Sequence, residues 1–324
     1  MRGLAFQVLR RLGSGEFQSG EALAKSLHVS RSAISEALKR AEEYGVRLYR
    51  IRGRGYRLES PVEFINADHV VRLLGIAADI VRLEVLDEGV STNTLVGERA
   101  ALGEPGGLCI LAEFQSAGRG RLGRTWHSGL GGALTFSLLW RFDRGASHLA
   151  GLSLAVSVGV LRGLHEAGIE GASVKWPNDI LVNFRKLAGI LIETQGDMLG
   201  PSAAVIGIGL NFRLQDEVKD KIDQPVVDVA SIAGEPVSRN VIFAMVLKNV
   251  VDVLHAFERD GFPAVRDEWQ AAHAYHGRQV RVMSAAEPVS GGVVAGVDDD
   301  GALLIKSGTQ ISRLTSAEIS LKTR

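Results

Sequence analysis

The apolar positions of the first sixty residues follow a helical spacing three times and then alternate. The first helical pattern covers Leu4–Leu12, and Gly13 ends it. Ser19 and Ser30 stand where the N-cap residues of a second and a third helix belong. We therefore expect three short helices, of which the last ends near Gly45, a glycine in a C-cap position.

The outward face of the predicted third helix is polar and basic, and a basic hairpin follows it. Alternation over Leu48–Arg52, a turn at Gly53–Gly55 and a return over Tyr56–Leu58 predict that hairpin. This order of elements is typical of a winged helix-turn-helix. A helical packing module with a solvated face is the alternative, but the order favours DNA binding. The residues expected to contact DNA are Arg31, Ser32, Ser35, Lys39 and Arg40 on the helix, and Arg52 and Arg54 in the hairpin.

From about residue 84 the chain changes to short apolar runs that are typical of strands. Helical spacing interrupts them twice, from Leu149 to Leu164 and over Ile242–Phe257. Because strands and helices do not alternate strictly, the pattern favours an α+β domain over a doubly wound one. The predicted strands are 108–114, 133–140, 174–176, 180–182, 187–193 and 203–212.

The last fifty residues predict a small β-domain. Asp299-Asp300-Gly301 and Ser307-Gly308 supply turns between short apolar runs. The size is that of an SH3-like β-barrel. We expect three domains, covering residues 1–62, 63–272 and 273–324. The predicted C-terminal strands are 280–282, 289–297, 302–306 and 311–314.

Charge and composition sharpen this picture. The 324 residues hold 37 Lys/Arg and 37 Asp/Glu, but residues 1–60 hold twelve basic and six acidic residues, which hints at a polyanionic partner. A single cysteine, Cys109, excludes an internal disulfide framework, and its apolar neighbours predict a buried thiol. No signal peptide or membrane-length apolar run is seen, so we expect a cytoplasmic protein that does not bind membranes.

The segment from Gln115 to Trp126 is the first candidate for chemistry. It contains Gly118-Arg119-Gly120-Arg121-Leu122-Gly123-Arg124, which matches the dinucleotide fingerprint G-x-G-x-x-G. No helix is predicted at its end and arginines stand between the glycines, so we reject a dehydrogenase. The composition instead favours a flexible loop whose arginines bind phosphate or carboxylate, with Trp126 available to stack on a base. A solvated basic loop is the alternative.

Two further motifs surround predicted strands. Lys175-Trp176-Pro177-Asn178-Asp179 predicts a turn, and Lys186–Ile190 follows it. The two lysines can converge, with Asn178 and Asp179 available for Mg²⁺ or a nucleotide, although lysine at a strand edge often only snorkels. Ser91-Thr92-Asn93 resembles a helix cap, and the glycines of Gly207–Asn211 permit close approach of a ligand. Each of these last two signals is weak alone.

Together these pieces resemble the biotin–protein ligases that double as repressors of biotin synthesis. The resemblance runs from Gly15–Gly20 to Glu318–Leu321, which is essentially the whole chain. One departure is Leu122, where some members carry arginine. The family implies a winged helix-turn-helix, a central mixed α/β ligase domain and a C-terminal SH3-like barrel. The most specific markers are Gly118–Arg121 with Trp126, Lys175–Asp179 and Lys186–Ile190.

The resemblance also implies roles for individual residues. Arg121 and Lys186 are the expected catalytic residues, and Asp179 is a candidate ligand for Mg²⁺. The positions expected near ATP or the adenylate are Arg121, Trp126, Lys175, Asn178 and Asn211. The positions expected to bind biotin are Ser91, Thr92, Asn93, Gln115, Arg119, Gly120, Arg121, Lys186 and Gly209.

The implied reaction uses ATP, biotin and Mg²⁺, without a tightly bound prosthetic group. Biotin is activated as biotinyl-5′-AMP and then transferred to a lysine of the biotin carboxyl carrier protein of acetyl-CoA carboxylase. The other implied partners are operator DNA and a second copy of the chain, bound when the adenylate is present. A lipoate–protein ligase, or a ligand-sensing repressor without ligase activity, remains an alternative.

Overall fold

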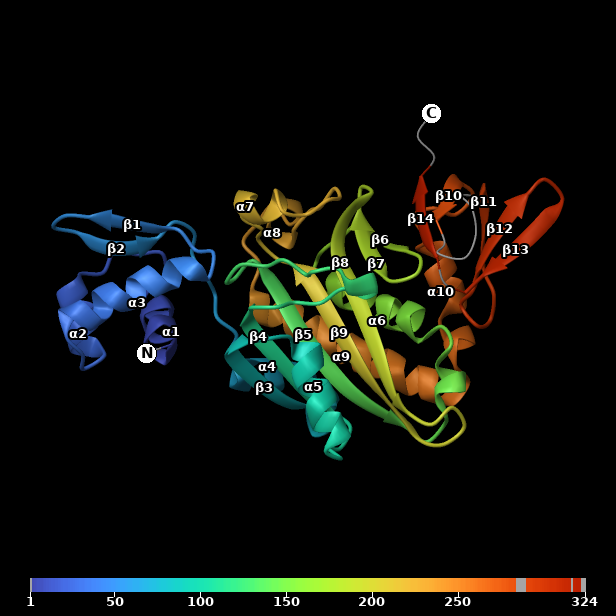
Figure 1. The fold of residues 1–324 in the computed structure, drawn as a ribbon, viewed down its shortest axis with the longest axis horizontal. Helices are drawn as coiled ribbons and strands as arrows, with labels where there is room; N and C mark the ends of the chain where they lie inside the picture. The colour runs from blue at the N-terminus through green and yellow to red at the C-terminus, as the bar shows by residue number, and fades with distance from the viewer. Residues whose placement is uncertain (1, 284–289, 316, 322–324) are drawn as a thin grey trace.

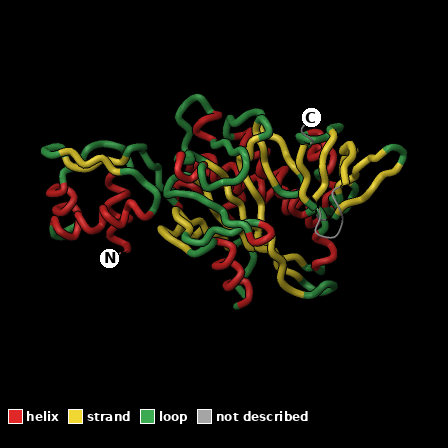
Figure 2. The backbone as a smooth tube through the Cα atoms, turned by 45° about the horizontal axis from the view of Figure 1, so that its top comes forward, coloured by secondary structure: helices red, strands yellow, loops and turns green. Residues whose placement is uncertain are grey.

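The computed structural model describes residues 2–283, 290–315 and 317–321. Figures 1 and 2 show a small helical domain at one end, a large sheet with its helices in the middle, and a second, smaller sheet at the other end. The structure is thus a mixed α+β fold, as the sequence predicts. The start of the strand expected at Val289 lies outside the described residues.

The N-terminal domain has three helices and a two-stranded hairpin, which confirms the predicted elements. Ser19 Oγ accepts a hydrogen bond from the Ala22 amide at 3.0 Å, and Ser30 Oγ accepts one from the Ala33 amide at 3.1 Å, so both serines cap helices. Gly45 has a φ of +76°, as its place beyond the third helix requires. The elements are α1 (Arg2–Leu12), α2 (Gly20–Ser26), α3 (Arg31–Glu43), β1 (Leu48–Ile51) and β2 (Gly55–Leu58).

The central part is built on one seven-stranded sheet. Its strands are β3 (Arg82–Gly89), β4 (Leu108–Gln115), β5 (Ala133–Phe142), β6 (Ala172–Lys175), β7 (Asp179–Val182), β8 (Arg185–Gly196) and β9 (Ser202–Asn211). They lie in the order β3-β4-β5-β9-β8-β7-β6, and only β3 and β4 run parallel to each other. The predicted strands are therefore all present, in a mixed sheet rather than a doubly wound one.

Helices cover both faces of this sheet. On one face α6 (Leu152–Glu166) and α9 (Arg239–Asp260) pack against each other, and on the other face α5 (Thr92–Ala101) packs against β4, β5 and β9. By length and composition α9 could cross a membrane, but 61% of its most apolar window is buried in this layer, as in a core helix. The prediction that one helix runs from Leu149 is wrong, because Gly151 at a φ of +77° separates a short 3-10 turn from α6.

Short helices complete the connections. The α-helices are α4 (Ala67–Leu74), α7 (Asp216–Lys219), α8 (Val229–Ile232) and α10 (Arg266–Ala271). The 3-10 helices are η1 (Gly75–Asp79), η2 (Arg121–Gly123), η3 (Ala146–Leu149) and η4 (Phe262–Ala264). Sequence periodicity does not reveal them, since each is too short to show a repeat.

The C-terminal part is a five-stranded antiparallel sheet. Its strands are β10 (Gln279–Met283), β11 (Ser290–Val297), β12 (Leu303–Ser307), β13 (Gln310–Leu314) and β14 (Glu318–Leu321), in the order β13-β12-β11-β10-β14. Four of these strands were expected; β14 was not. Val280 and Leu303 belong to the same hydrophobic core as the large sheet, and Trp176 Nε1 donates to Gly301 O at 3.0 Å. The small sheet is therefore fixed firmly to the central part.

A buried ion pair ties the connection from the N-terminal domain to the central part. Arg239 Nη1 lies 2.9 Å from Glu113 Oε2, and both side chains are almost fully buried. Glu113 also accepts from the Ile65 amide at 2.6 Å, and Arg239 donates to Glu63 O and Ala133 O. The linker is therefore held to β4 and α9 by charged hydrogen bonds.

Candidate functional site

The ligase residues expected from the sequence meet at one cavity. Its volume is about 620 Å³, and it lies over β8 and β9 beside the start of α5. All fourteen positions expected for biotin, adenylate or metal line this cavity, although they come from five separate segments of the chain. They are Ser91, Thr92, Asn93, Gln115, Arg119, Gly120, Arg121, Trp126, Lys175, Asn178, Asp179, Lys186, Gly209 and Asn211.

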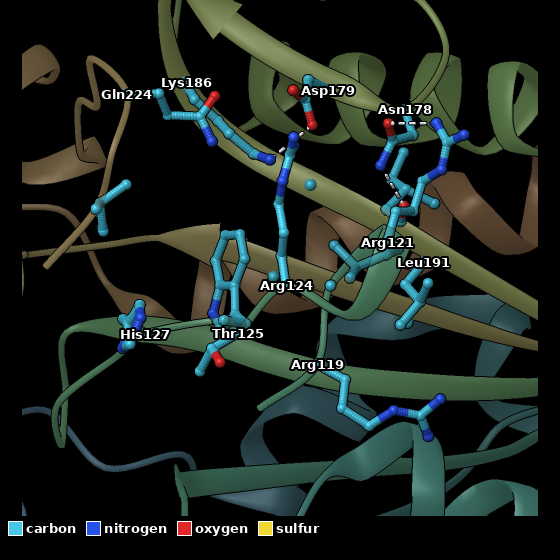
Figure 3. Close-up of a pocket in the computed structure, with 18 of the residues that line it drawn as sticks. Arg119, Arg121, Arg124, Thr125, His127, Asn178, Asp179, Lys186, Leu191 and Gln224 are labelled. Carbon is cyan, nitrogen blue, oxygen red and sulfur yellow. Dashed lines mark hydrogen bonds and ion pairs between the residues drawn. The ribbon is translucent and has the colours of Figure 1, made fainter. Parts of the chain in front are cut away.

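A lysine–aspartate pair forms the electrostatic centre of the cavity. Lys186 Nζ lies 2.7 Å from Asp179 Oδ1, and the two side chains are only 17% and 13% exposed. Figure 3 shows Arg124 reaching up from the loop toward the same pair. Lys186, Asp179 and Arg124 together carry one net positive charge, which attracts an anion strongly where water screens charges little. Arg124 was expected, with the other two loop arginines, to bind phosphate or carboxylate, but it was not assigned to biotin, the adenylate or catalysis.

Arg121 is held in place by Asn178, which is itself bonded to β8. Its Nη1 donates to Asn178 Oδ1 at 3.0 Å, while Asn178 Nδ2 donates to Ile190 O at 2.8 Å. The main chain of Asn178 accepts from the Ile190 amide at 2.9 Å as well. Asn178 therefore orients Arg121 relative to β8.

Two glycines, Gly189 and Gly209, leave space for the Trp126 ring of the loop. Gly189 on β8 and Gly209 on β9 are direct partners in the sheet. A Cβ added at Gly209 would lie 2.5 Å from the Trp126 ring, so only glycine leaves room for the indole. The glycines were expected to let a ligand approach; the group that approaches here is Trp126, with Lys186 Nζ 5.9 Å from the ring centroid.

Polar side chains form a second floor under the start of α5. Ser137 Oγ lies 2.7 Å from Thr92 Oγ1 and 2.6 Å from Asn93 Oδ1, and Gln115 Oε1 accepts from the Thr92 amide at 2.7 Å. All four side chains are buried. Sequence reasoning found three of them but missed Ser137, because a serine within an apolar strand carries no signal of its own.

Several lining residues come from segments in which the sequence showed no chemistry. Met283, Ile319 and Ser320 reach the cavity from the C-terminal sheet. Asn211, expected near the adenylate, donates to the carbonyls of Lys186 and Val227, so it fixes the neighbouring chain. The lining residues between β9 and α8 are Lys221, Ile222, Asp223, Gln224 and Val226.

The expected metal ligand has no carboxylate cluster around it. Within residues 2–283, 290–315 and 317–321, no group of three His, Cys, Asp or Glu side chains can hold a metal ion. Asp179 therefore offers one carboxylate, which suits Mg²⁺ bound chiefly through substrate phosphates. The same carboxylate and burial raise the pKa of nearby Tyr275, with burial as the larger cause.

The expected DNA-contact residues lie in the N-terminal domain and are mostly exposed. Arg31, Ser32, Ser35 and Lys39 lie on the outward side of α3, and Arg40 is half-buried. Arg52 and Arg54 are exposed at the hairpin tip, where the Arg54 guanidinium lies 4.3 Å from the centroid of the Phe17 ring. This arrangement is a winged helix-turn-helix with its basic side chains outward.

A helix-turn-helix domain is thus joined to a mixed sheet that carries an anion-binding cavity. Residues 90–211 match the biotin/lipoate A/B protein ligase family, residues 5–57 an HTH domain, and residues 275–322 the biotin protein ligase C terminal domain. The bifunctional ligase/repressor BirA of Escherichia coli is 33% identical over 98% of this chain and 96% of its own length. The BirA protein of Bacillus subtilis is 29% identical over 94% of each chain. This chain belongs to the bifunctional ligase/repressor family.

A solved structure agrees with this assignment. The biotin protein ligase from Aquifex aeolicus in complex with biotin and ATP is 28% identical and superposes with a TM-score of 0.63. It covers 75% of this chain and is itself covered over 99% of its length. The biotin–protein ligase resemblance that the sequence motifs suggested is therefore confirmed.

Proposed function

We propose that the protein is an ATP-dependent biotin–protein ligase that also represses biotin synthesis. The observation that carries the proposal is the convergence of Lys186, Asp179, Arg121 and Arg124 over a glycine floor. Two anions, a carboxylate and a triphosphate, must meet before they can react. Cationic groups fixed around one cavity offset that repulsion and stabilise the charge that develops in the transition state.

In the first step the biotin carboxylate attacks the α-phosphorus of ATP, giving biotinyl-5′-AMP and pyrophosphate. Arg121 and Lys186 stabilise the charge on the α-phosphate, and Asp179 and Asn178 hold them in place. Mg²⁺ would neutralise the phosphates, with Asp179 as a ligand from the protein. In the second step a lysine ε-amine of the carrier protein attacks the carbonyl carbon of the mixed anhydride and AMP leaves.

We assign the lining residues to two binding roles, one for biotin and one for the adenylate. Ser91, Thr92, Asn93, Gln115, Arg119, Gly120 and Gly209 surround biotin, whereas Trp126, Lys175 and Asn211 lie toward the adenylate. The loop of residues 116–127 covers the product, because water would hydrolyse the anhydride. The carrier protein is the biotin carboxyl carrier protein of acetyl-CoA carboxylase.

The N-terminal domain is proposed to bind operator DNA. Arg31, Ser32, Ser35, Lys39 and Arg40 would enter or flank the major groove, with Arg52 and Arg54 on adjacent phosphates. A homodimer formed by the adenylate-bound protein would read two half-sites. We further propose domain limits of 1–62, 63–272 and 273–324, an SH3-like form for the last domain, and a cytoplasmic location.

The test is pyrophosphate release from ATP with biotin, with lipoate, or with neither. We expect release that depends on biotin, followed by transfer of the biotinyl group to a carrier-protein lysine. Release with lipoate alone would replace the proposal with a lipoate ligase. Binding of biotin without any release would leave a ligand-sensing repressor.

A further inference from the structure

Glu193, on β8, occupies a position between the cavity floor and the arginine loop. Its Oε2 accepts a hydrogen bond from Asn93 Nδ2 at 2.9 Å, and its Oε1 pairs with Arg119 Nη2. The carboxylate thus bridges the start of α5 and the loop between β4 and β5. Nothing in the sequence pattern or in the proposed function assigns a task to this residue.

Asn93, the partner of Glu193 at the start of α5, has both polar side-chain atoms in hydrogen bonds. Asn93 is 5% exposed, its Nδ2 also donates to Leu191 O at 3.2 Å, and its Oδ1 lies 2.6 Å from Ser137 Oγ. A Cβ at Gly207 would lie 2.0 Å from that Oδ1, so the backbone of β9 also presses on the amide. These contacts fix the Asn93 side chain, and Asn93 in turn fixes the carboxylate of Glu193.

The partner on the loop side is Arg119, whose side chain is 47% exposed. Its Nη1 also donates to Thr94 Oγ1 at 3.2 Å. Figure 3 shows Arg119 directed away from Arg121 and Arg124. Of the three loop arginines, it is thus the one that reaches back to α5 and β8 rather than toward the cationic, anion-binding part of the cavity.

The loop itself is a self-bonded hairpin. The Gly120 amide donates to Arg124 O at 2.7 Å, and the Trp126 amide donates to Gly118 O at 2.9 Å. Its start is tied to β3 by the Ser116 and Ala117 amides. Because the loop is bonded to itself, we expect it to move as a unit. The contact between Arg119 and Glu193 therefore also fixes the position of Trp126.

We infer that Glu193 is a positioning residue that holds the loop over the cavity by joining Arg119 to Asn93. The inference rests on the proposed activation of biotin at this cavity. Glu193 contacts Asn93 and Arg119, whereas Lys186 is paired with Asp179 and Arg121 with Asn178. Its loss should therefore weaken retention of biotin under the loop and leave the phosphoryl chemistry intact.

The first test compares steady-state kinetics of Glu193→Gln, which keeps the size and can still accept from Asn93 but loses the charge that holds Arg119. We expect the KM for biotin to rise about five- to tenfold, as loss of a charge-assisted contact implies, while kcat and the KM for ATP stay within about twofold. Glu268→Gln is the matched control, because it removes a surface pair between α10 and Arg162 of α6, and neither residue lines the cavity. A wild-type KM for biotin in Glu193→Gln would overturn the inference.

The second test asks whether Glu193 acts through Arg119. We expect Arg119→Met to raise the KM for biotin similarly, and the double variant to be no worse than either single one, as for two halves of one contact. Trypsin cleavage after Arg121 and Arg124 should be faster in all three variants than in wild type. Additive losses, or unchanged cleavage, would contradict the tether. If wild type releases no pyrophosphate with biotin, the proposed function fails, while the cleavage rates still decide about Glu193.

Discussion

The cavity and the basic surface of the N-terminal domain both display arginine and lysine, but they hold these side chains differently. In the cavity Lys186 is paired with Asp179 at 2.7 Å and Arg121 is held by Asn178 at 3.0 Å. On the N-terminal domain Lys39 approaches Glu36 only to 3.8 Å, with both side chains more than half exposed. Catalysis needs charges fixed before the reaction, whereas DNA supplies its own array of phosphates to mobile cations.

The two regions are joined by direct contacts. The Leu130 amide donates to Tyr44 O at 2.9 Å, just past the end of α3, and Leu130 is buried in the N-terminal core. Arg10 pairs with Asp87 at 2.7 Å, and Arg47 pairs with Glu217 on α7. Residues on either side of Leu130 and just after α7 line the cavity. We therefore expect that binding of a ligand in the cavity affects the N-terminal domain.

The largest expected effect comes from breaking the buried pair at the linker. Arg239→Met removes the partner of the buried Glu113 carboxyl group, which should lower the free energy of unfolding by about 3 to 5 kcal/mol. Urea denaturation followed by circular dichroism measures it. The double variant Arg239→Met with Glu113→Leu should recover much of the loss. A single variant within about 1 kcal/mol of wild type would show that the pair does not anchor the linker.

The next effect is on the cavity alone. Lys186→Ala and Arg121→Ala should each slow single-turnover adenylate formation by about 100- to 1000-fold, equivalent to roughly 2.7 to 4 kcal/mol, by analogy with lost oxyanion donors. DNA binding without ligand should stay unchanged, since these residues lie outside the N-terminal domain. Rates within about threefold of wild type would remove both residues from the catalytic role.

A pH titration of stability tests a buried group outside both regions, His273. Burial, with a smaller effect from His276, lowers the pKa of His273 to about 3 from 6.5. The unfolded chain therefore binds a proton that the folded chain excludes, so stability is complete above about pH 6.5 and falls as the pH drops. The loss at pH 5 should be about 2 kcal/mol. His273→Phe should flatten this part of the unfolding free energy against pH; an unchanged slope would exclude His273 as its source.

The smallest effect is expected on the exposed surface. Replacing Lys39 or Arg52 with alanine should weaken DNA binding by a similar factor on all sequences and lower the slope of log affinity against log salt by about one. Biotin-dependent pyrophosphate release should not change. A full salt slope in the variant would mean that the residue does not contact a phosphate.

How much could be read from the sequence depended on how local each signal was. Ser19, Ser30 and Gly45 mark helix ends through their own backbone contacts, so the N-terminal helices were predicted correctly. The arginine loop and the Lys175–Asp179 motif could be recognised because each is a continuous run of residues in the sequence. That they meet at one cavity depends on the pairing of β7, β8 and β9, which only the folded chain reveals.

The residues that the sequence did not reveal are those whose role depends on a distant partner. Ser137 is an ordinary strand serine until Thr92 and Asn93 lie above it. Glu193 is an ordinary strand glutamate until the folded chain brings Arg119 against it. Leu149 was assigned to the wrong element because helical spacing continues through Gly151, whose left-handed φ breaks the helix.

The central claim is that the adenylate formed in the cavity controls the N-terminal surface. Its direct test is a titration of DNA, selected for binding from a random-sequence pool, with the wild-type protein in the presence and absence of biotin plus ATP. A coupling of about 1 to 3 kcal/mol predicts roughly 5- to 150-fold tighter binding with both substrates, together with a larger dimer fraction in sedimentation. Equal affinities and an unchanged monomer fraction would contradict the claim and leave a ligase whose DNA-binding domain does not sense its product.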